Sequence, residues 1–163
     1  MRTLAHAINT DPISTDTTSM LYAALDNLIN ATKIIKREYK SQQDIMGREV
    51  WLRDFCTIKL QAARRSGHDS CIRKMIETNA DKQFMIVHPT IDQSRYFKEN
   101  SRSCSNYSLA VAYNLGNYRD ISDIDYLVVN TASCVRQEDL KNIYSFALSC
   151  FANNPDFLII LIG

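Results

Sequence analysis

The sequence is poor in the residues that interrupt regular structure and has no long hydrophobic run. Only four glycines and three prolines occur among 163 residues, of which 45% are apolar, so the composition favours one folded domain over a disordered chain. No apolar run approaches the roughly 20 residues of a membrane-spanning helix. The polar start, MRTLAHAINTDP, also lacks the apolar core of a secretory signal. We therefore expect no membrane association and a cytoplasmic location.

Closely spaced cysteine pairs are absent too. The cysteines are odd in number and widely spaced, which disfavours a disulfide framework, and without a CxxC pair a zinc site is not expected. We predict reduced core thiols at Cys56, Cys71, Cys104, Cys134 and Cys150. A cysteine nucleophile paired with His68 or His88 is an alternative that no sequence motif supports.

What the sequence does contain is a strand, a polar loop and a helix between Thr57 and Met75, TIKLQAARRSGHDSCIRKM. This is the order of a phosphate-binding P-loop, whose pattern is Gly, four residues, Gly, Lys and then Ser or Thr. Here the corresponding residues are Ala62, Gly67, His68 and Asp69, so three of the four differ. The alternative is an ordinary polar loop in which Asp69 or Ser70 caps the next helix.

Each departure weakens phosphate binding. His68 is shorter than lysine and mostly neutral near pH 7. Asp69 places a carboxylate where a hydroxyl ligand of magnesium is needed, facing the anion. An intact nucleotide site is therefore not expected, although Arg64, Arg65, Ser66, Gly67, His68 and Ser70 are the candidates for any remaining contact with phosphate.

Apolar strands alternate with helices downstream of this loop. We predict strands at 83–87 and 125–129, a further strand within 109–115, and a final strand at 157–162. Helices are expected after Thr90, with Ile91, Tyr96 and Phe97 in the core, and at 137–152. Such alternation predicts an α/β fold with a mostly parallel sheet and helices on both faces. The alternation of polar and apolar residues in the strand at 56–61 suits a half-exposed strand.

The order RRSG, IVHPTIDQSRYF, DYLVVNTAS and LIILIG resembles the ATPase core of the viral DNA-packaging terminase large subunit and its helicase-like P-loop relatives. The resemblance implies a three-layer P-loop-NTPase-like fold in degenerate form. It puts His68 at the lysine, Asp69 at the magnesium-binding hydroxyl, Asn130 at the metal-binding aspartate and Thr131 at the water-activating glutamate. It also implies that Gly67 and Asn130 lie close together on neighbouring parallel strands.

The resemblance therefore implies the architecture of an ATPase without turnover, because the Walker A lysine and Walker B carboxylates are missing. We expect no catalytic residues, no metal and no cofactor, with weak ATP and magnesium binding left open. The predicted role is a non-hydrolysing binding or regulatory component of viral origin in the host cytoplasm. One alternative is an ATP-hydrolysing DNA-packaging domain with atypical ligands, in which Asp69 or Asp125 holds the metal. Another is a domain completed by a missing partner chain.

We predict one domain, in which a flexible lead (1–19) and a helical extension (20–55) precede the core (56–163). The extension carries an amphipathic helix with Met20, Leu21, Leu25, Leu28, Ile29, Ile35 and Tyr39 on its apolar side, and a second helix at 48–55. Residues 31–75 hold eleven Lys or Arg against five acids, although the net charge is only +1. A protein partner, such as an ATPase, a packaging or replication component or a host enzyme, is expected, with nucleic acid as an alternative. The oligomeric state is left open.

Overall fold

A five-stranded parallel sheet forms the centre of the computed structural model, which describes residues 15–62, 66–118 and 123–163. Its strand order is β1-β5-β4-β2-β3, and every neighbouring pair is parallel. The strands are β1 (Thr57–Leu60), β2 (Phe84–His88), β3 (Tyr107–Val111), β4 (Tyr126–Asn130) and β5 (Leu158–Ile162). All residues of β2, β4 and β5 are buried, as expected of strands covered on both faces.

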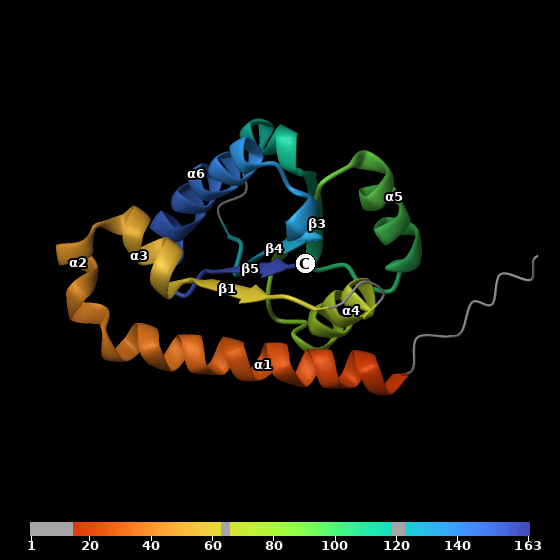
Figure 1. The fold of residues 1–163 in the computed structure, drawn as a ribbon, viewed down its shortest axis with the longest axis horizontal. Coiled ribbons are helices and arrows are strands. Elements are labelled where there is room, and N and C mark those ends of the chain that lie inside the picture. The colour runs from red at the N-terminus through yellow and green to blue at the C-terminus, as the bar shows by residue number, and fades with distance from the viewer. Residues whose placement is uncertain (1–14, 63–65, 119–122) are drawn as a thin grey trace, which may run out of the picture.

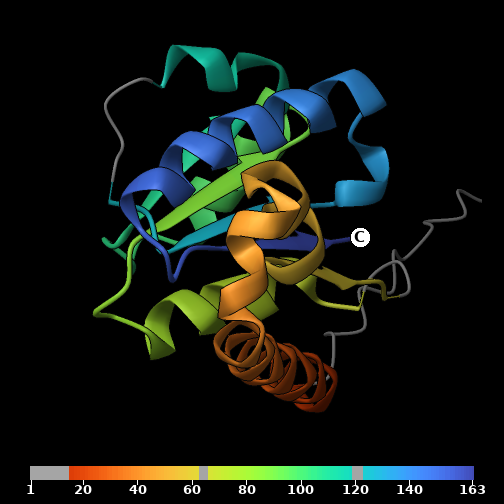
Figure 2. The same cartoon turned by 90° about the vertical axis from the view of Figure 1, so that its left-hand side faces the viewer.

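Helices cover both faces of this sheet, which confirms the predicted three-layer α/β fold, consistent with a P-loop-NTPase-like arrangement (Figure 1; Figure 2). The long helix α1 (Thr15–Glu38) packs against α4 (His68–Thr78) on one face, and α6 (Gln137–Asn153) packs with the 3-10 helix η2 (Ala112–Asn117) on the other. Helix α5 (Ile91–Asn100) contacts β2 and β3. Among the described residues, no helix combines the length and apolar character needed to cross a membrane.

Short helices connect α1 to the sheet. They are η1 (Lys40–Gln42), α2 (Gln43–Met46) and α3 (Arg48–Phe55), and the short η3 (Ala132–Cys134) follows β4. The only tryptophan, Trp51 on α3, is buried and stacks on Phe55 with ring centroids 4.4 Å apart. The second helix predicted in the extension is therefore confirmed, and it is anchored by its aromatic residues.

The position of β5 corrects one expectation. The strands that precede Gly67 and end at Asn130 are not neighbours, because β5 lies between β1 and β4. The reason lies in composition: the uncharged run of β5 must be covered on all sides, whereas Lys59 in the middle of β1 is exposed. An edge position suits β1, which confirms its predicted half-exposed character.

Several predicted boundaries and core positions also need correction. Of the cysteines predicted in the core, Cys134 is exposed and Cys104 is half-buried, whereas the other three are buried. Helix α1 already begins at Thr15, within the predicted flexible lead, whose first 14 residues lie outside the described part. The strand expected in 109–115 is β3 followed by η2. On α5, Phe97 is buried, but Ile91 and Tyr96 are 44% and 60% exposed, because this helix packs beside the edge strand β3 and its neighbour β2, where one side of the helix faces solvent.

The apolar side predicted for α1 is divided between core and solvent. Leu25 and Ile29 are buried, and Leu21 packs partly against the core. The other four predicted residues of this side, Met20, Leu28, Ile35 and Tyr39, are exposed. The helix therefore anchors the extension by a narrow stripe and leaves a second apolar stripe uncovered.

Candidate functional site

The turn into α4 begins at Gly67, which has a left-handed backbone (φ 85°, ψ 32°) and takes the N-cap position. Glycine suits this conformation because it has no Cβ to clash. The predicted cap by Asp69 or Ser70 is wrong, since α4 already starts at His68. Of the other candidate phosphate ligands, Arg64 and Arg65 lie outside the described residues.

A pocket of about 530 Å³ lies between this turn and the carboxyl ends of the strands. The carboxyl ends of parallel strands are where open α/β sheets usually bind ligands. The pocket brings together seven of the predicted site residues, namely Ser66, Gly67, His68, Asp69, Ser70, Asn130 and Thr131. The sequence-based grouping of these residues is thus matched by their position, while their roles stay predictions.

A hydrogen bond joins the two sides of the pocket. Asn130, at the end of β4, donates from Nδ2 to Oδ1 of Asp69 on α4 at 2.5 Å. Asp69 lies in the first turn of α4, where a carboxylate is favoured by the positive end of the helix dipole. A negative charge in this turn disfavours the binding of a phosphate at the same helix end.

Thr131 follows β4 in a left-handed conformation (φ 55°, ψ 46°) and is the only described non-glycine residue with positive φ. A β-branched residue rarely adopts this geometry, whose strain is on the order of 1 kcal/mol. It starts η3, in which Cys134 donates its backbone N–H to the Thr131 carbonyl at 2.9 Å. The strained turn places η3 at the edge of the pocket, in contact with β5.

Buried polar atoms without a partner among the described residues gather here. They include Oδ1 of Asn130, Oγ of Ser66 and Nε2 of His68. Asn130 itself is only 2% exposed. Buried polar groups normally find a hydrogen-bond partner, so these atoms make the pocket suitable for water or a small polar ligand.

The two histidines of this region are kept neutral. Burial lowers the pKa of His68, and the charge of Asp69 opposes this only in part. Burial likewise lowers the pKa of His88, which ends β2 at 1% exposure and lies 5.3 Å from the ring of Phe97. Neither ring therefore supplies the permanent positive charge that a lysine would bring to phosphate.

From the sequence, His88 was named only as the alternative partner of a cysteine nucleophile. In the structure, both of its ring nitrogens are buried without a partner among the described residues. The charge of Asp69 opposes the lowering of the His88 pKa by burial only in part. The available signal was a polar residue that closes a continuous apolar run, as Asn130 closes the apolar run of β4.

Other predicted chemistry is not assembled. Burial raises the pKa of Cys71 on α4 to about 11, so a thiolate is disfavoured there. Asp125, the alternative metal ligand, precedes the first residue of β4 and therefore lies at the opposite end of the sheet from Asn130. Within the described ranges, no cluster of three or more His, Cys, Asp or Glu is placed to hold a metal ion.

The fold is similar to that of the large terminase ATPase domain of Thermus phage P74-26. The TM-score is 0.49 at 13% identity, and the match covers 72% of this chain and 63% of that domain. A point mutant of the same domain gives 0.49 and 13%, with 68% and 61% covered. This chain therefore spans less than two thirds of either domain. No protein-family model and no curated protein sequence matches the chain. Nothing about activity in this chain follows from the structural similarity.

Proposed function

We propose that the chain is a catalytically inactive P-loop-ATPase-like protein that acts by binding another protein. The observation that carries this proposal is the hydrogen bond between Asn130 and Asp69. By the sequence resemblance, these are the two positions that hold magnesium in an active ATPase. Here they are an amide and a carboxylate that bind each other. A metal would have to compete with Asn130 for the carboxylate of Asp69.

The remaining chemistry is weakened in the same way. Phosphoryl transfer needs charge neutralisation at the phosphates and an acceptor for the proton of the attacking water. His68 has a lowered pKa and so supplies no permanent charge. Thr131, at the position of the water-activating glutamate, has a hydroxyl in place of a carboxylate. These changes support binding without turnover.

A protein partner is favoured by the exposed apolar stripe of α1. Met20, Leu28 and Ile35 are exposed by 68%, 38% and 43%, and exposed apolar patches commonly mark interaction sites. We propose an ATPase, a packaging or replication component or a host enzyme as the partner, with the chain acting in the cytoplasm of an infected host. Nucleic acid is the alternative partner.

ATP hydrolysis by the purified chain in magnesium tests the catalytic half of this proposal. We expect no turnover above the buffer blank. A matched variant that restores the four positions (His68→Lys, Asp69→Thr, Asn130→Asp, Thr131→Glu) reveals whether the scaffold can still support the reaction. Robust wild-type turnover that is abolished by Asn130→Ala would reject the proposal.

A pull-down with the full chain tests the binding half. The proposal predicts a specific protein partner whose capture is lost when Leu28→Glu and Ile35→Glu are introduced together. Exposed Ala23→Glu is the matched control on another side of the same helix. Equal capture by all three proteins would reject α1 as the docking surface.

The second candidate is an ATP-binding domain with atypical ligands. It is favoured by the two pocket-lining oxygen sources, the Asp69 carboxylate and the unpartnered Asn130 Oδ1. Calorimetry with ATP and magnesium distinguishes the candidates. Magnesium-dependent heat that disappears in Asp69→Asn would support this second candidate, whereas the absence of heat at millimolar ATP would remove its support.

A further inference from the structure

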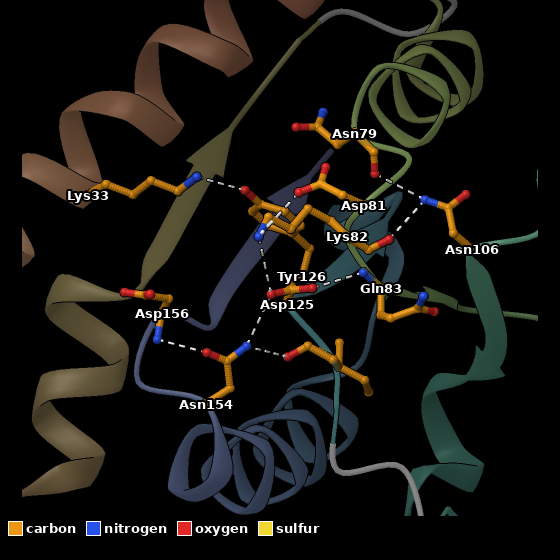
Figure 3. Close-up of polar contacts among 11 residues, drawn as sticks. Lys33, Asn79, Asp81, Lys82, Gln83, Asn106, Asp125, Tyr126, Asn154 and Asp156 are labelled. Carbon is orange, nitrogen blue, oxygen red and sulfur yellow. Dashed lines mark hydrogen bonds and ion pairs between the residues drawn. The ribbon is translucent and has the colours of Figure 1, made fainter.

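A second pocket, of about 590 Å³, lies at the amino ends of the strands, opposite the first pocket at their carboxyl ends (the carboxyl-end pocket). It is formed where the end of α1 passes the residues that lead into β2, β4 and β5 (Figure 3). Its charged lining consists of five cations and two carboxylates: Lys33, Lys36, Arg37, Lys40, Lys82, Asp125 and Asp156. A chain of net charge +1 thus concentrates positive charge in one concavity.

Two of these cations are held by the fold itself. Lys36 is only 8% exposed, and its Nζ donates to the carbonyl of Pro155 at 2.8 Å and to that of Phe157 at 3.2 Å. Lys33 donates from Nζ to the hydroxyl of Tyr126 at 2.9 Å, with Nζ 5.5 Å from the ring centroid. An ammonium has three donors, so the bond to Tyr126 leaves Lys33 able to bind an anion.

The carboxylate of Asp125 is already engaged in structural contacts (Figure 3). It accepts the backbone N–H of Gln83 at 2.9 Å and Nδ2 of Asn154 at 3.2 Å, and it lies 4.0 Å from Nζ of Lys82. These contacts tie together the segments that enter β2, β4 and β5. Asp125 is therefore poorly placed to neutralise the cations across the pocket.

Two further cations have no such partner. Arg37 and Lys40 are exposed at the end of α1 and in η1. Within the described part of the chain, neither makes an ion pair. Asp156, the second carboxylate of the pocket, donates its backbone N–H to Asn154, and the charge of its side chain acts on the buried Lys36. The pocket thus combines preorganised and free positive charge.

We propose that this amino-end pocket binds a compact, multiply charged anion of the polyphosphate or phosphate-ester class. Concave walls with one sign of charge concentrate oppositely charged ligands. The volume falls in the range of about 300–1,000 Å³ typical of small-molecule sites. Arginine recognises phosphate oxygens bidentately, and lysine does so as a point charge. A compact anion can contact the cations on several sides of this cavity, which an extended strand crossing its mouth does less well.

Calorimetry of the full chain with tripolyphosphate tests the proposal. We expect saturable binding that weakens at least tenfold when Arg37→Gln and Lys40→Gln are combined, because both lose their charge at exposed positions. The matched control is Arg95→Gln with Lys98→Gln on α5, where two cations of the same types are also exposed. It should leave the affinity within twofold. Circular dichroism and the melting temperature verify that each variant is folded.

Further arms locate the site and distinguish its ligands. Arg73→Gln changes the carboxyl-end pocket and should leave tripolyphosphate binding intact. Loss of binding in this variant would overturn the proposal. Equal affinities for ATP and tripolyphosphate indicate recognition of the phosphates alone, whereas a higher affinity for ATP indicates recognition of a phosphate ester. Either result supports the site if binding depends on Arg37 and Lys40. No wild-type binding, equal weakening by the α5 control, or binding of a single-stranded oligonucleotide without tripolyphosphate would each overturn it.

Discussion

The two ends of the parallel sheet differ in how their charged side chains are placed. At the carboxyl ends, where α/β sheets usually bind ligands, the charged group Asp69 is bound by Asn130 and the histidines are kept neutral. At the amino ends, the carboxylate of Asp125 is engaged while Arg37 and Lys40 remain without ion pairs among the described residues. Topology alone therefore does not identify the end that is equipped to bind an anion.

The two pockets also draw on different parts of the chain. The carboxyl-end pocket is made only of core residues between 61 and 163. The amino-end pocket takes Lys33, Lys36 and Arg37 from α1 and Lys40 from η1. The extension thus supplies the positive charge that the P-loop-like turn does not provide in the described residues, and the following predictions test this division.

The largest effect is expected from Asn130→Asp. This change places a second carboxylate against Asp69 at a position that is 2% exposed. Because like charges this close cannot both ionise freely, we expect a loss of about 3 kcal/mol in unfolding free energy at pH 7. The loss should shrink as the pH falls toward 4, since a proton shared by the two carboxylates removes the repulsion. Urea unfolding across this pH range measures it.

The matched control exchanges the two groups, Asp69→Asn with Asn130→Asp. The amide and the carboxylate then still face each other, so the double variant should recover to within about 1 kcal/mol of the wild type, with the coupling measured by a double-mutant cycle. Full recovery of the single Asn130→Asp variant by millimolar magnesium would break the comparison. It would mean that one added charge suffices to turn the carboxyl-end pocket into a metal site.

The second effect concerns Lys36 at the other end. Lys36→Met keeps the length of the side chain but removes the donor to the carbonyls of Pro155 and Phe157. Unpaired buried carbonyls are unfavourable, so we expect a loss of about 2 kcal/mol in unfolding free energy at pH 7. Lys33→Met, which removes a single hydrogen bond to Tyr126, is the control and should lose less.

The pH dependence of this pair follows from the lowered pKa of Lys36, which burial causes. At pH values between that lowered pKa and the usual lysine pKa of 10.5, the unfolded chain binds more protons than the folded chain. Wild-type stability should therefore rise relative to Lys36→Met as the pH increases through this window. A difference that narrows instead would mean that the protonated ammonium is stabilised by the fold, contrary to its burial.

The sequence could predict the layers and the grouping of the site, because these depend on local patterns. Continuous apolar runs identify β2, β4 and β5, and the residues after their ends must meet at one edge of a parallel sheet. Lys59 also indicates the edge position of β1. The insertion of β5 between β1 and β4 was missed, because strand order depends on tertiary packing that no short motif encodes.

The hydrogen bond between Asp69 and Asn130 joins residues 61 positions apart, and its distance is set by how α4 packs on the sheet. The amino-end pocket was missed for a similar reason, since Lys33 meets Tyr126 across 93 positions. A signal for it did exist. Lys36 follows Leu25 and Ile29 at helical spacing, which puts a lysine on the apolar side of α1. All three side chains are buried. A buried lysine needs partners, and that need points to a polar site.

A smaller effect is expected from Gly67→Ala at the P-loop-like turn. The left-handed backbone of Gly67 is unfavourable for a residue with a Cβ, so the variant should lose about 1 kcal/mol. Gly67→Asn is the control, because asparagine tolerates this conformation better, and thermal unfolding should place it between the wild type and Gly67→Ala. Equal stability of all three would mean that the turn relaxes freely, and Gly67 would then be no evidence for a retained phosphate-binding geometry.

The smallest effect sharpens the comparison most directly. Arg37→Gln removes an exposed cation that makes no ion pair with a described residue. The unfolding free energy of the protein should therefore change by less than about 0.5 kcal/mol. Because Lys33 and Lys82 line the same pocket and carry the same charge as Arg37, removing the charge of Arg37 relieves repulsion, and the change should be stabilising at low salt. Added salt should cancel this gain by screening. A clear loss of stability would instead assign Arg37 a structural contact, and the amino-end pocket would then lack the free charge that distinguishes it from the carboxyl-end pocket.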